Sequence, residues 1–222
     1  MLVWLSSYPR SGNTFVRILL SQVFGLGAFS LHGDNDPQSF GSPALTELVG
    51  HRTGGSSKDR IISEAQRSAE LNIVKTHEHP LTDDPCIFIV RDGRSSVVSY
   101  WHFLREIAGI DIALEQVVCG NCFAGSWSDH YVAWQPKLRP HTLLLRYEEI
   151  VKDPGRTVAA LSDFLRIQPH KNFDLTFEGL KGLNPKFFRS GSDQNNIAEL
   201  AEHADLFWTH HGHVMGDLLY GS

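Results

Sequence analysis

The sequence predicts an α/β fold, with a central parallel sheet flanked by helices in a single domain. Short apolar runs typical of buried strands alternate with segments of helical periodicity, which favours a doubly wound parallel sheet. The 222 residues, 41% of them hydrophobic, suffice for one full core and leave little room for a second. We therefore assign residues 1–222 to one domain and expect ligands beyond the carboxyl ends of the strands.

The secondary structure is predicted from apolar runs and their spacing. The expected strands are Leu2–Ser6, Leu71–Thr76, Cys86–Val90 and Thr142–Tyr147, the third of them buried on both faces. The expected helices run from about Asn13 to Gly25, Arg94 to Leu104, Ser128 to Leu138 and Pro154 to Leu165. Residues 32–60, rich in Gly, Ser, Pro and Asp, are predicted to be irregular, and the tail from Ile197 to Leu219 mostly helical.

Composition excludes several classes of protein. The formal net charge of −5 does not favour binding to nucleic acid or to an anionic membrane, so a bound anion needs a local cluster of basic residues. No apolar run approaches the roughly 20 residues of a membrane span. The first residues lack the pattern of a signal peptide, and three cysteines indicate a reducing compartment. We expect a cytoplasmic protein with neither a membrane nor a nucleic-acid partner.

The loop after the first strand, Tyr8–Thr14, is the main candidate for an anion site. It leads into a helix whose first N–H groups and dipole favour a negative charge. The GxxxxGK[ST] pattern of nucleotide-binding loops fits only at Thr14, because Asn13 stands where the lysine would be. The loop is therefore a phosphate loop of another kind, or an ordinary connection between strand and helix.

Residues 8–15, Tyr-Pro-Arg-Ser-Gly-Asn-Thr-Phe, resemble the 5′-phosphosulfate loop of sulfotransferases that use 3′-phosphoadenosine 5′-phosphosulfate (PAPS). Arg10, Asn13 and Phe15 replace the usual lysine, threonine and tryptophan. The resemblance implies a fold of the P-loop nucleotide-transferase type and PAPS as the sulfuryl donor, with no metal. It also implies nucleotide contacts from the residues of the loop, namely Arg10, Ser11, Gly12, Asn13, Thr14 and Phe15.

A second anion site is predicted after the strand Cys86–Val90. Arg91 ends this strand and Ser99 lies eight residues further on, in the next expected helix. A guanidinium fork and a hydroxyl suit a phosphate monoester, and the spacing is similar to the 3′-phosphate segment of the same family. Two other interpretations stay open. Arg91 could close a helix or pair with Asp92, and Asp92 could bind Mg²⁺ as in nucleotidases.

Lys75 and His77 are the candidate catalytic pair. They lie two residues apart at the end of a strand and therefore project to one side of it. The Lys-Thr-His sequence resembles the catalytic strand end of the family. It implies His77 as general base and Lys75 at the leaving group, with Arg10 stabilising the transferred group. Taken alone, His77 would be an ordinary surface histidine, and His79 is close enough to replace it.

Later segments complete the resemblance. Leu145–Glu149 resembles a family stretch whose tyrosine contacts adenine, which implies this role for Tyr147, and Phe177 aligns with an aromatic that stacks on the base. Both are equally compatible with a place in the core. Arg189, Ser190 and Gly191 resemble the late Arg-Lys-Gly segment that closes on the 3′-phosphate. Since Ser190 replaces a lysine, weaker nucleotide binding or a compensating residue is expected.

Other patterns are assigned no function. A single Cys119–Cys122 pair lacks the second ligand pair of a structural zinc site, and His210, His211 and His213 are expected in an exposed tail. Trp101, Trp127 and Trp134 are expected in the core or in a pocket wall.

The predicted function is sulfuryl transfer from PAPS to a hydroxyl or amine. The alternatives are a kinase-like ATP-dependent transferase and a non-catalytic nucleotide-binding relative. The acceptor is expected among residues 32–60, 102–127 and 178–188, and its identity and the oligomeric state are open.

Overall fold

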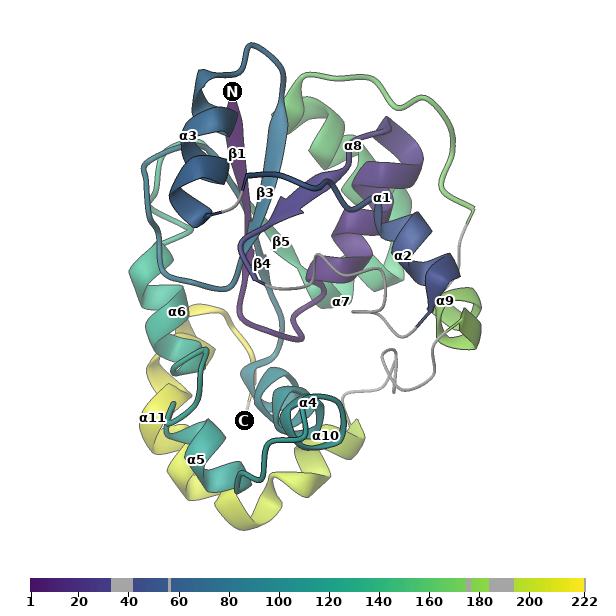
Figure 1. Ribbon diagram of the computed structural model, residues 1–222. Coiled ribbons are helices and arrows are strands. Elements are labelled where there is room, and N and C mark those ends of the chain that lie inside the picture. Colours follow the sequence, from purple (N-terminus) through teal and green to yellow (C-terminus); the bar gives the residue numbers. More distant parts are fainter. Residues whose placement is uncertain (33–41, 56, 175–176, 184–193, 222) are drawn as a thin grey trace.

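The chain forms one parallel five-stranded sheet, in the order β2-β3-β1-β4-β5 (Figure 1). The computed structural model describes residues 1–32, 42–55, 57–174, 177–183 and 194–221. The strands are β1 (Leu2–Ser7), β2 (Ala28–Ser30), β3 (Asn72–Thr76), β4 (Cys86–Val90) and β5 (Thr142–Arg146). The α/β fold and the four predicted strands are confirmed, and each pair of neighbouring strands is parallel. The sequence prediction missed β2, because three residues at a sheet edge form no recognisable apolar run.

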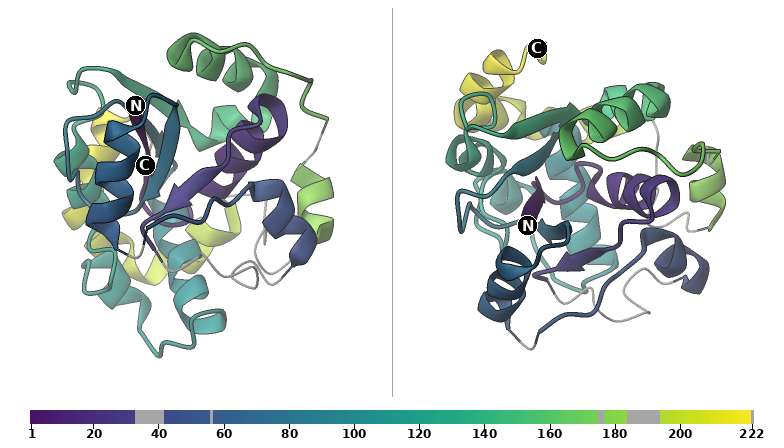
Figure 2. Two further views of the ribbon diagram at one scale, coloured as in Figure 1. Left: turned by 45° about the horizontal axis from the view of Figure 1, so that its top comes forward. Right: turned by 90° about the horizontal axis from the view of Figure 1, so that it is seen from above.

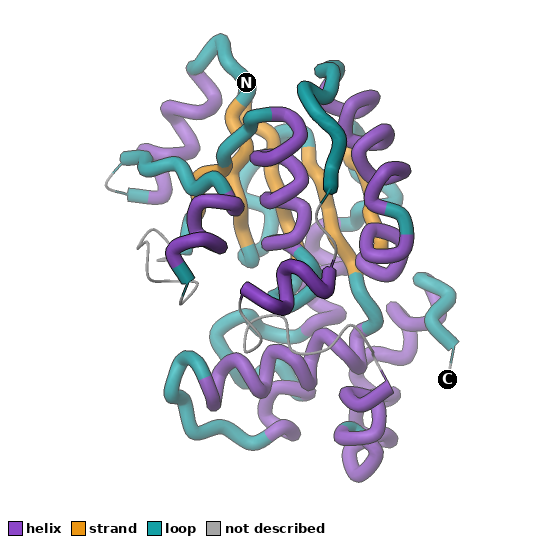
Figure 3. The backbone as a smooth tube through the Cα atoms, turned by 90° about the vertical axis from the view of Figure 1, so that its right-hand side faces the viewer, coloured by secondary structure: helices purple, strands orange, loops and turns teal. Residues whose placement is uncertain are grey.

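Helices cover both faces of the sheet (Figures 1 and 3). Side chains of β1 alternate between two cores: Leu2 and Trp4 enter one, and Val3 and Leu5 the other. The first core is shared with α3 (Lys58–Arg67), α4 (Gly93–Glu106), α5 (Leu114–Val118), α6 (Trp127–Trp134) and α11 (Ala204–Asp217). The second is shared with α1 (Asn13–Phe24), α2 (Pro43–Val49), α7 (Tyr147–Lys152), α8 (Pro154–Leu165) and α9 (Phe177–Leu183).

Most predicted helices are confirmed, with adjusted ends. The helix predicted to run to Leu138 ends at Trp134, because Gln135 takes a left-handed conformation with φ 43°. The tail is mostly helical, as expected, and consists of α10 (Gln194–Glu199), the 3₁₀ turn η1 (Ala201–His203) and α11. No helix lies in residues 77–85, all of them described, so the alternation of strands and helices is interrupted between β3 and β4.

Two sequence predictions are wrong. Residues 32–60 are not irregular throughout their described part, since Ser42 caps α2 and Ser57 caps α3 with their hydroxyls. His211 is not exposed: it is completely buried, its Nδ1 lies 2.8 Å from Ser128 Oγ, and its Nε2 donates to Val118 O at 3.0 Å. The tail buries this imidazole because both ring nitrogens find partners inside the fold.

The fold places the loops of interest at one edge of the sheet. Because β1 lies between β3 and β4, the segments that follow Ser7, Thr76 and Val90 leave the sheet side by side. Helices α4, α5, α10 and α11 gather beyond this edge, and the view from above in Figure 2 shows the remaining helices flanking the sheet. Within the described ranges, every helix is too short or too polar to cross a bilayer.

Candidate active site

The loop between β1 and α1 is wound tightly by two residues of positive φ. Arg10 has φ 65° and Gly12 has φ 103°, after which α1 begins at Asn13. A Cβ atom on Gly12 would lie 2.5 Å from Cδ2 of Tyr147, so only glycine fits. The loop therefore carries the backbone N–H groups of the first helical turn toward the carboxyl edge of the sheet, where they favour an anion.

Two predicted contact residues of this loop turn their side chains inward. Asn13 Nδ2 donates to Leu5 O at 3.2 Å and to Ser7 Oγ at 3.3 Å. Ser11 Oγ lies 3.2 Å from Ser96 Oγ on α4. These side chains fasten the loop to its neighbours. The backbone N–H of Ser11 donates to Tyr8 O at 3.3 Å, so an anion would meet Asn13 through its backbone N–H group.

The remaining loop residues differ in exposure. Thr14 is half-buried on the first turn of α1. Phe15 is 2% exposed, and its ring centroid lies 5.7 Å from that of Phe173, so Phe15 belongs to the core. A contact between Phe15 and an adenine stays a prediction.

The first loop and the second predicted anion segment come together. Arg10 Nε donates to Ser99 Oγ at 3.2 Å, and Arg91 Nη1 donates to Arg10 O at 3.1 Å. The Arg91 guanidinium carbon lies 4.4 Å from the centroid of the Tyr147 ring, a cation–π geometry. Four of the residues singled out from sequence thus form one cluster, built from segments that follow β1, β4 and β5.

The contacts of Asp92 differ from the two that the sequence left open, an ion pair with Arg91 and binding of Mg²⁺. Its carboxylate caps α4 by accepting the Arg94 backbone N–H at 2.9 Å. Both of its oxygens also accept from the Arg94 side chain, at 2.7 Å for Nη2 to Oδ2. A carboxylate held in this way by an arginine on its own helix is poorly disposed to bind Mg²⁺.

Lys75 and His77 lie at the end of β3, next to this cluster. Lys75 is 7% exposed, paired in register with Leu5 of β1 and Ser30 of β2. His77 follows the strand directly, and its Nδ1 lies 2.7 Å from Ser7 O. Since a carbonyl oxygen only accepts, the proton sits on Nδ1, and Nε2 keeps a lone pair that can take a proton.

The electrostatic surroundings keep His77 neutral. Burial lowers the pKa of His77 well below its usual 6.5, and the ammonium of Lys75 and the ring of His32 lower it further. The hydrogen bond to the Ser7 carbonyl opposes these effects only in part. A neutral imidazole with an available Nε2 is the form that a general base requires.

His32 is a residue of this site that the sequence prediction missed. Its Nε2 accepts the backbone N–H of His77 at 2.8 Å, and the two ring centroids lie 5.2 Å apart. The ring of Phe123, which is 77% exposed, is nearly perpendicular to that of His32, with the centroids 6.1 Å apart. His32 follows the short strand β2, which was not recognised. The sequence therefore placed His32 only within the stretch 32–60 expected near the acceptor and gave it no role of its own.

His79 and His130 form a second pair of imidazoles nearby. Their ring centroids lie 6.4 Å apart, with His79 exposed and His130 buried. Burial, followed by the neighbouring His79, lowers the pKa of His130 to about 3.

The structure describes only some of the other predicted residues. Phe177 is the first residue of α9, whereas Arg189, Ser190 and Gly191 lie outside the described residues. Trp127 and Trp134 are in the core, as expected, and Trp101 packs against it. In the described part of the chain, no three His, Cys, Asp or Glu side chains are grouped so as to hold a metal ion.

Comparison with known proteins identifies the family. The family model described as a sulfotransferase domain matches residues 2–197. The chain belongs to the sulfotransferase domain family. This sulfotransferase domain is 29% identical over 182 residues to flavonol 3-sulfotransferase of Flaveria bidentis, covering 73% of this chain and 56% of the relative. It is 27% identical over 200 residues to mouse sulfotransferase 1B1, covering 78% of this chain and 64% of the relative. The matched part thus spans less than two thirds of either relative.

Solved structures share the fold of this sulfotransferase domain. The crystal structure of mouse sulfotransferase SULT7A1 complexed with PAP superimposes with a TM-score of 0.65 at 21% identity, covering 93% of this chain and 82% of that one. Retinol dehydratase in complex with androsterone and the inactive cofactor PAP gives a TM-score of 0.60 at 18% identity, covering 94% and 79%.

Proposed function

We propose that this domain transfers a sulfuryl group from PAPS to a hydroxyl or amine, with His77 as general base. The observation that carries the proposal is the convergence of three segments at one edge of the sheet. They are the Tyr8–Thr14 loop, the Arg91–Ser99 segment joined to it through Arg10, and His77, whose Nε2 keeps its lone pair. A nucleotide with phosphates at both ends of its ribose needs two anion sites, which suits the first two segments.

In the proposed step, the acceptor oxygen or nitrogen attacks sulfur in line with the bond to the 5′-phosphate. The new bond to sulfur forms as the old sulfur–oxygen bond breaks. The electron pair of the broken bond stays on the phosphate oxygen of the leaving 3′-phosphoadenosine 5′-phosphate (PAP). His77 Nε2 takes the proton of the acceptor, while Lys75 and Arg10 stabilise the negative charge. Positioning and electrostatics carry such a transfer, by analogy with phosphoryl transfer.

The similarities to known proteins also support transfer of a sulfuryl group from PAPS. Relatives are named for sulfation of flavonols, which are hydroxyl compounds, and two structures of similar fold are complexes with PAP. These similarities favour a hydroxyl acceptor and PAPS as the sulfuryl donor.

Calorimetry separates this function from a kinase-like one. PAP should bind more tightly than adenosine 5′-phosphate, and more tightly than ATP with Mg²⁺. Equal affinity for the two adenosine nucleotides would remove the assignment of Arg91 and Ser99 to a 3′-phosphate.

Transfer of radiolabelled sulfate from PAPS to a panel of phenols, alcohols and amines tests catalysis. His77→Gln should lower turnover by about 10²–10⁴-fold with PAP affinity nearly intact. His79→Gln is the matched control and should stay close to wild type. The reverse result would transfer the role of base to His79, and a domain that binds PAP but transfers nothing to any acceptor would be a binding protein.

A further inference from the structure

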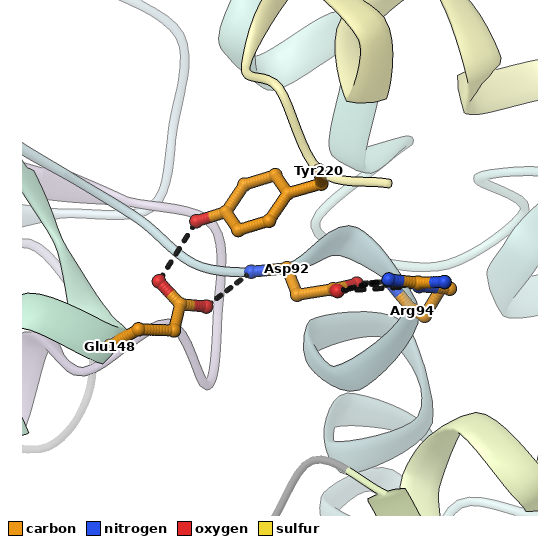
Figure 4. A network of polar contacts seen from close by, with 4 residues as sticks. All are labelled: Asp92, Arg94, Glu148 and Tyr220. Atoms are coloured by element: carbon orange, nitrogen blue, oxygen red, sulfur yellow. Dashed lines mark hydrogen bonds and ion pairs between the residues drawn. The ribbon is translucent and has the colours of Figure 1, made fainter. Parts of the chain in front are cut away.

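The C-terminal residues reach the candidate nucleotide site through a carboxylate. Glu148 Oε1 accepts the backbone N–H of Asp92 at 2.9 Å, and its Oε2 accepts the hydroxyl of Tyr220 at 2.9 Å (Figure 4). We call this arrangement the Asp92–Glu148–Tyr220 bridge. It joins three segments far apart in sequence: the start of α4, the first turn of α7 and the end of the chain.

Tyr220 is held firmly at its end of the bridge. Its backbone N–H donates to Met215 O at 2.9 Å, which folds the tail back onto α11. The Arg146 guanidinium lies over its ring, 4.9 Å from the centroid, and also donates to Leu218 O. Burial and the nearby Glu148 carboxylate raise the pKa of Tyr220, so its hydroxyl keeps the proton that it donates.

The other end of the bridge adjoins the predicted phosphate and adenine contacts. Asp92 directly follows Arg91, and Glu148 directly follows Tyr147. The Arg91 guanidinium lies over the Tyr147 ring and donates to Arg10 O. The Glu148 carboxylate therefore ties together the backbones that carry these two side chains, and the Tyr220 hydroxyl fixes the orientation of that carboxylate.

We infer that Tyr220 is a positioning residue for the nucleotide: through Glu148 it holds the backbone at Arg91 in the geometry that binds a 3′-phosphate. This inference rests on the proposed use of PAPS. The physical reason is that a carboxylate with a hydrogen bond to each oxygen is fixed in plane and rotation. Loss of the bond from Tyr220 weakens this restraint on the carboxylate, so the Asp92 N–H is held less firmly.

The test is Tyr220→Phe, which removes one hydroxyl and keeps the ring beneath Arg146. Calorimetry should show about three- to tenfold weaker binding of PAP, the loss expected when part of a hydrogen bond to a charged group is transmitted. Binding of adenosine 5′-phosphate should change less than about twofold, and kcat at saturating PAPS should be unchanged. The loss is thus specific to the 3′-phosphate.

The matched control is Tyr131→Phe. The Tyr131 hydroxyl donates to Asp217 Oδ2 at 2.6 Å, so it fastens the same tail to α6 without contact with the bridge. This variant should bind both nucleotides like wild type. If it weakens PAP as much as Tyr220→Phe does, general anchoring of the tail is responsible and the inference is wrong.

A double-mutant cycle tests directly whether Tyr220 acts through Glu148. In a Glu148→Ala background, Tyr220→Phe should have no further effect on PAP affinity, because its partner is gone. Full additivity of the two changes would overturn the inference. So would an unchanged ratio of PAP to adenosine 5′-phosphate affinity in Tyr220→Phe. A wild-type domain without any preference for the 3′-phosphate would instead refute the proposed function.

Discussion

Replacement of Gly12 by alanine tests the packing of the loop against the nucleotide site. The new Cβ would lie 2.5 Å from Tyr147 Cδ2 and 3.3 Å from Cε2, on a residue with φ 103°. Left-handed backbone costs a residue with a Cβ about 1–2 kcal/mol, and overpacking against a buried ring adds about 1–3 kcal/mol. We therefore expect Gly12→Ala to lower the free energy of unfolding by about 2–5 kcal/mol.

The same substitution should weaken nucleotide binding. The displaced Tyr147 ring carries the Arg91 guanidinium, and a cation–π contact of this kind is worth about 0.5–2 kcal/mol, or roughly 2- to 30-fold in the Kd of PAP. Urea unfolding measures the first effect and calorimetry with PAP the second.

Gly25→Ala is the control for Gly12→Ala. Gly25 also has positive φ, at 66°, but a Cβ there would meet only His170 Cδ2 at 3.9 Å, an ordinary contact. It should cost about 1–2 kcal/mol of stability and leave the Kd of PAP unchanged. The reasoning fails if Gly12→Ala binds PAP like wild type, or if it loses no more stability than Gly25→Ala.

Three further predictions concern titration and capping. The acid limb of kcat/KM should have its midpoint below pH 6.5, because the His77 pKa is lowered, and Lys75→Met should move it to higher pH; an unmoved limb contradicts this. His211, whose pKa is lowered to about 4 mainly by burial, binds its proton more readily in the unfolded chain. The contribution of His211 to the free energy of unfolding should therefore fall between pH 6.5 and 4, by up to about 3 kcal/mol. In urea, His211→Gln should flatten this fall and exposed His213→Gln should not. Asp153→Ala removes the side-chain cap of α8 and should cost about 1 kcal/mol, whereas Asp163→Ala, on the exposed face of the same helix, should cost almost nothing.

Much of the fold follows from local sequence patterns. The apolar runs Leu2–Ser6 and Cys86–Val90 predicted buried strands, because strands that are covered on both faces carry few polar side chains. Short elements were less visible: β2 has three residues and α2 seven, so neither shows a period long enough to recognise. The serine caps of α2 and α3 lay within a stretch whose Gly and Pro content favoured an irregular prediction.

The candidate site, like the fold, was predicted from the sequence only in part. The sequence by itself determined the parallel α/β architecture and the residue types of the loop, of Arg91 and Ser99, and of Lys75 and His77, because these motifs are contiguous or closely spaced. Only the tertiary structure decided that Asn13 and Ser11 face inward, that His32 supports His77, and that Tyr220 reaches Asp92 through Glu148. These contacts join segments distant along the chain, whose proximity depends on the order of strands in the sheet and on how the C-terminal helix packs.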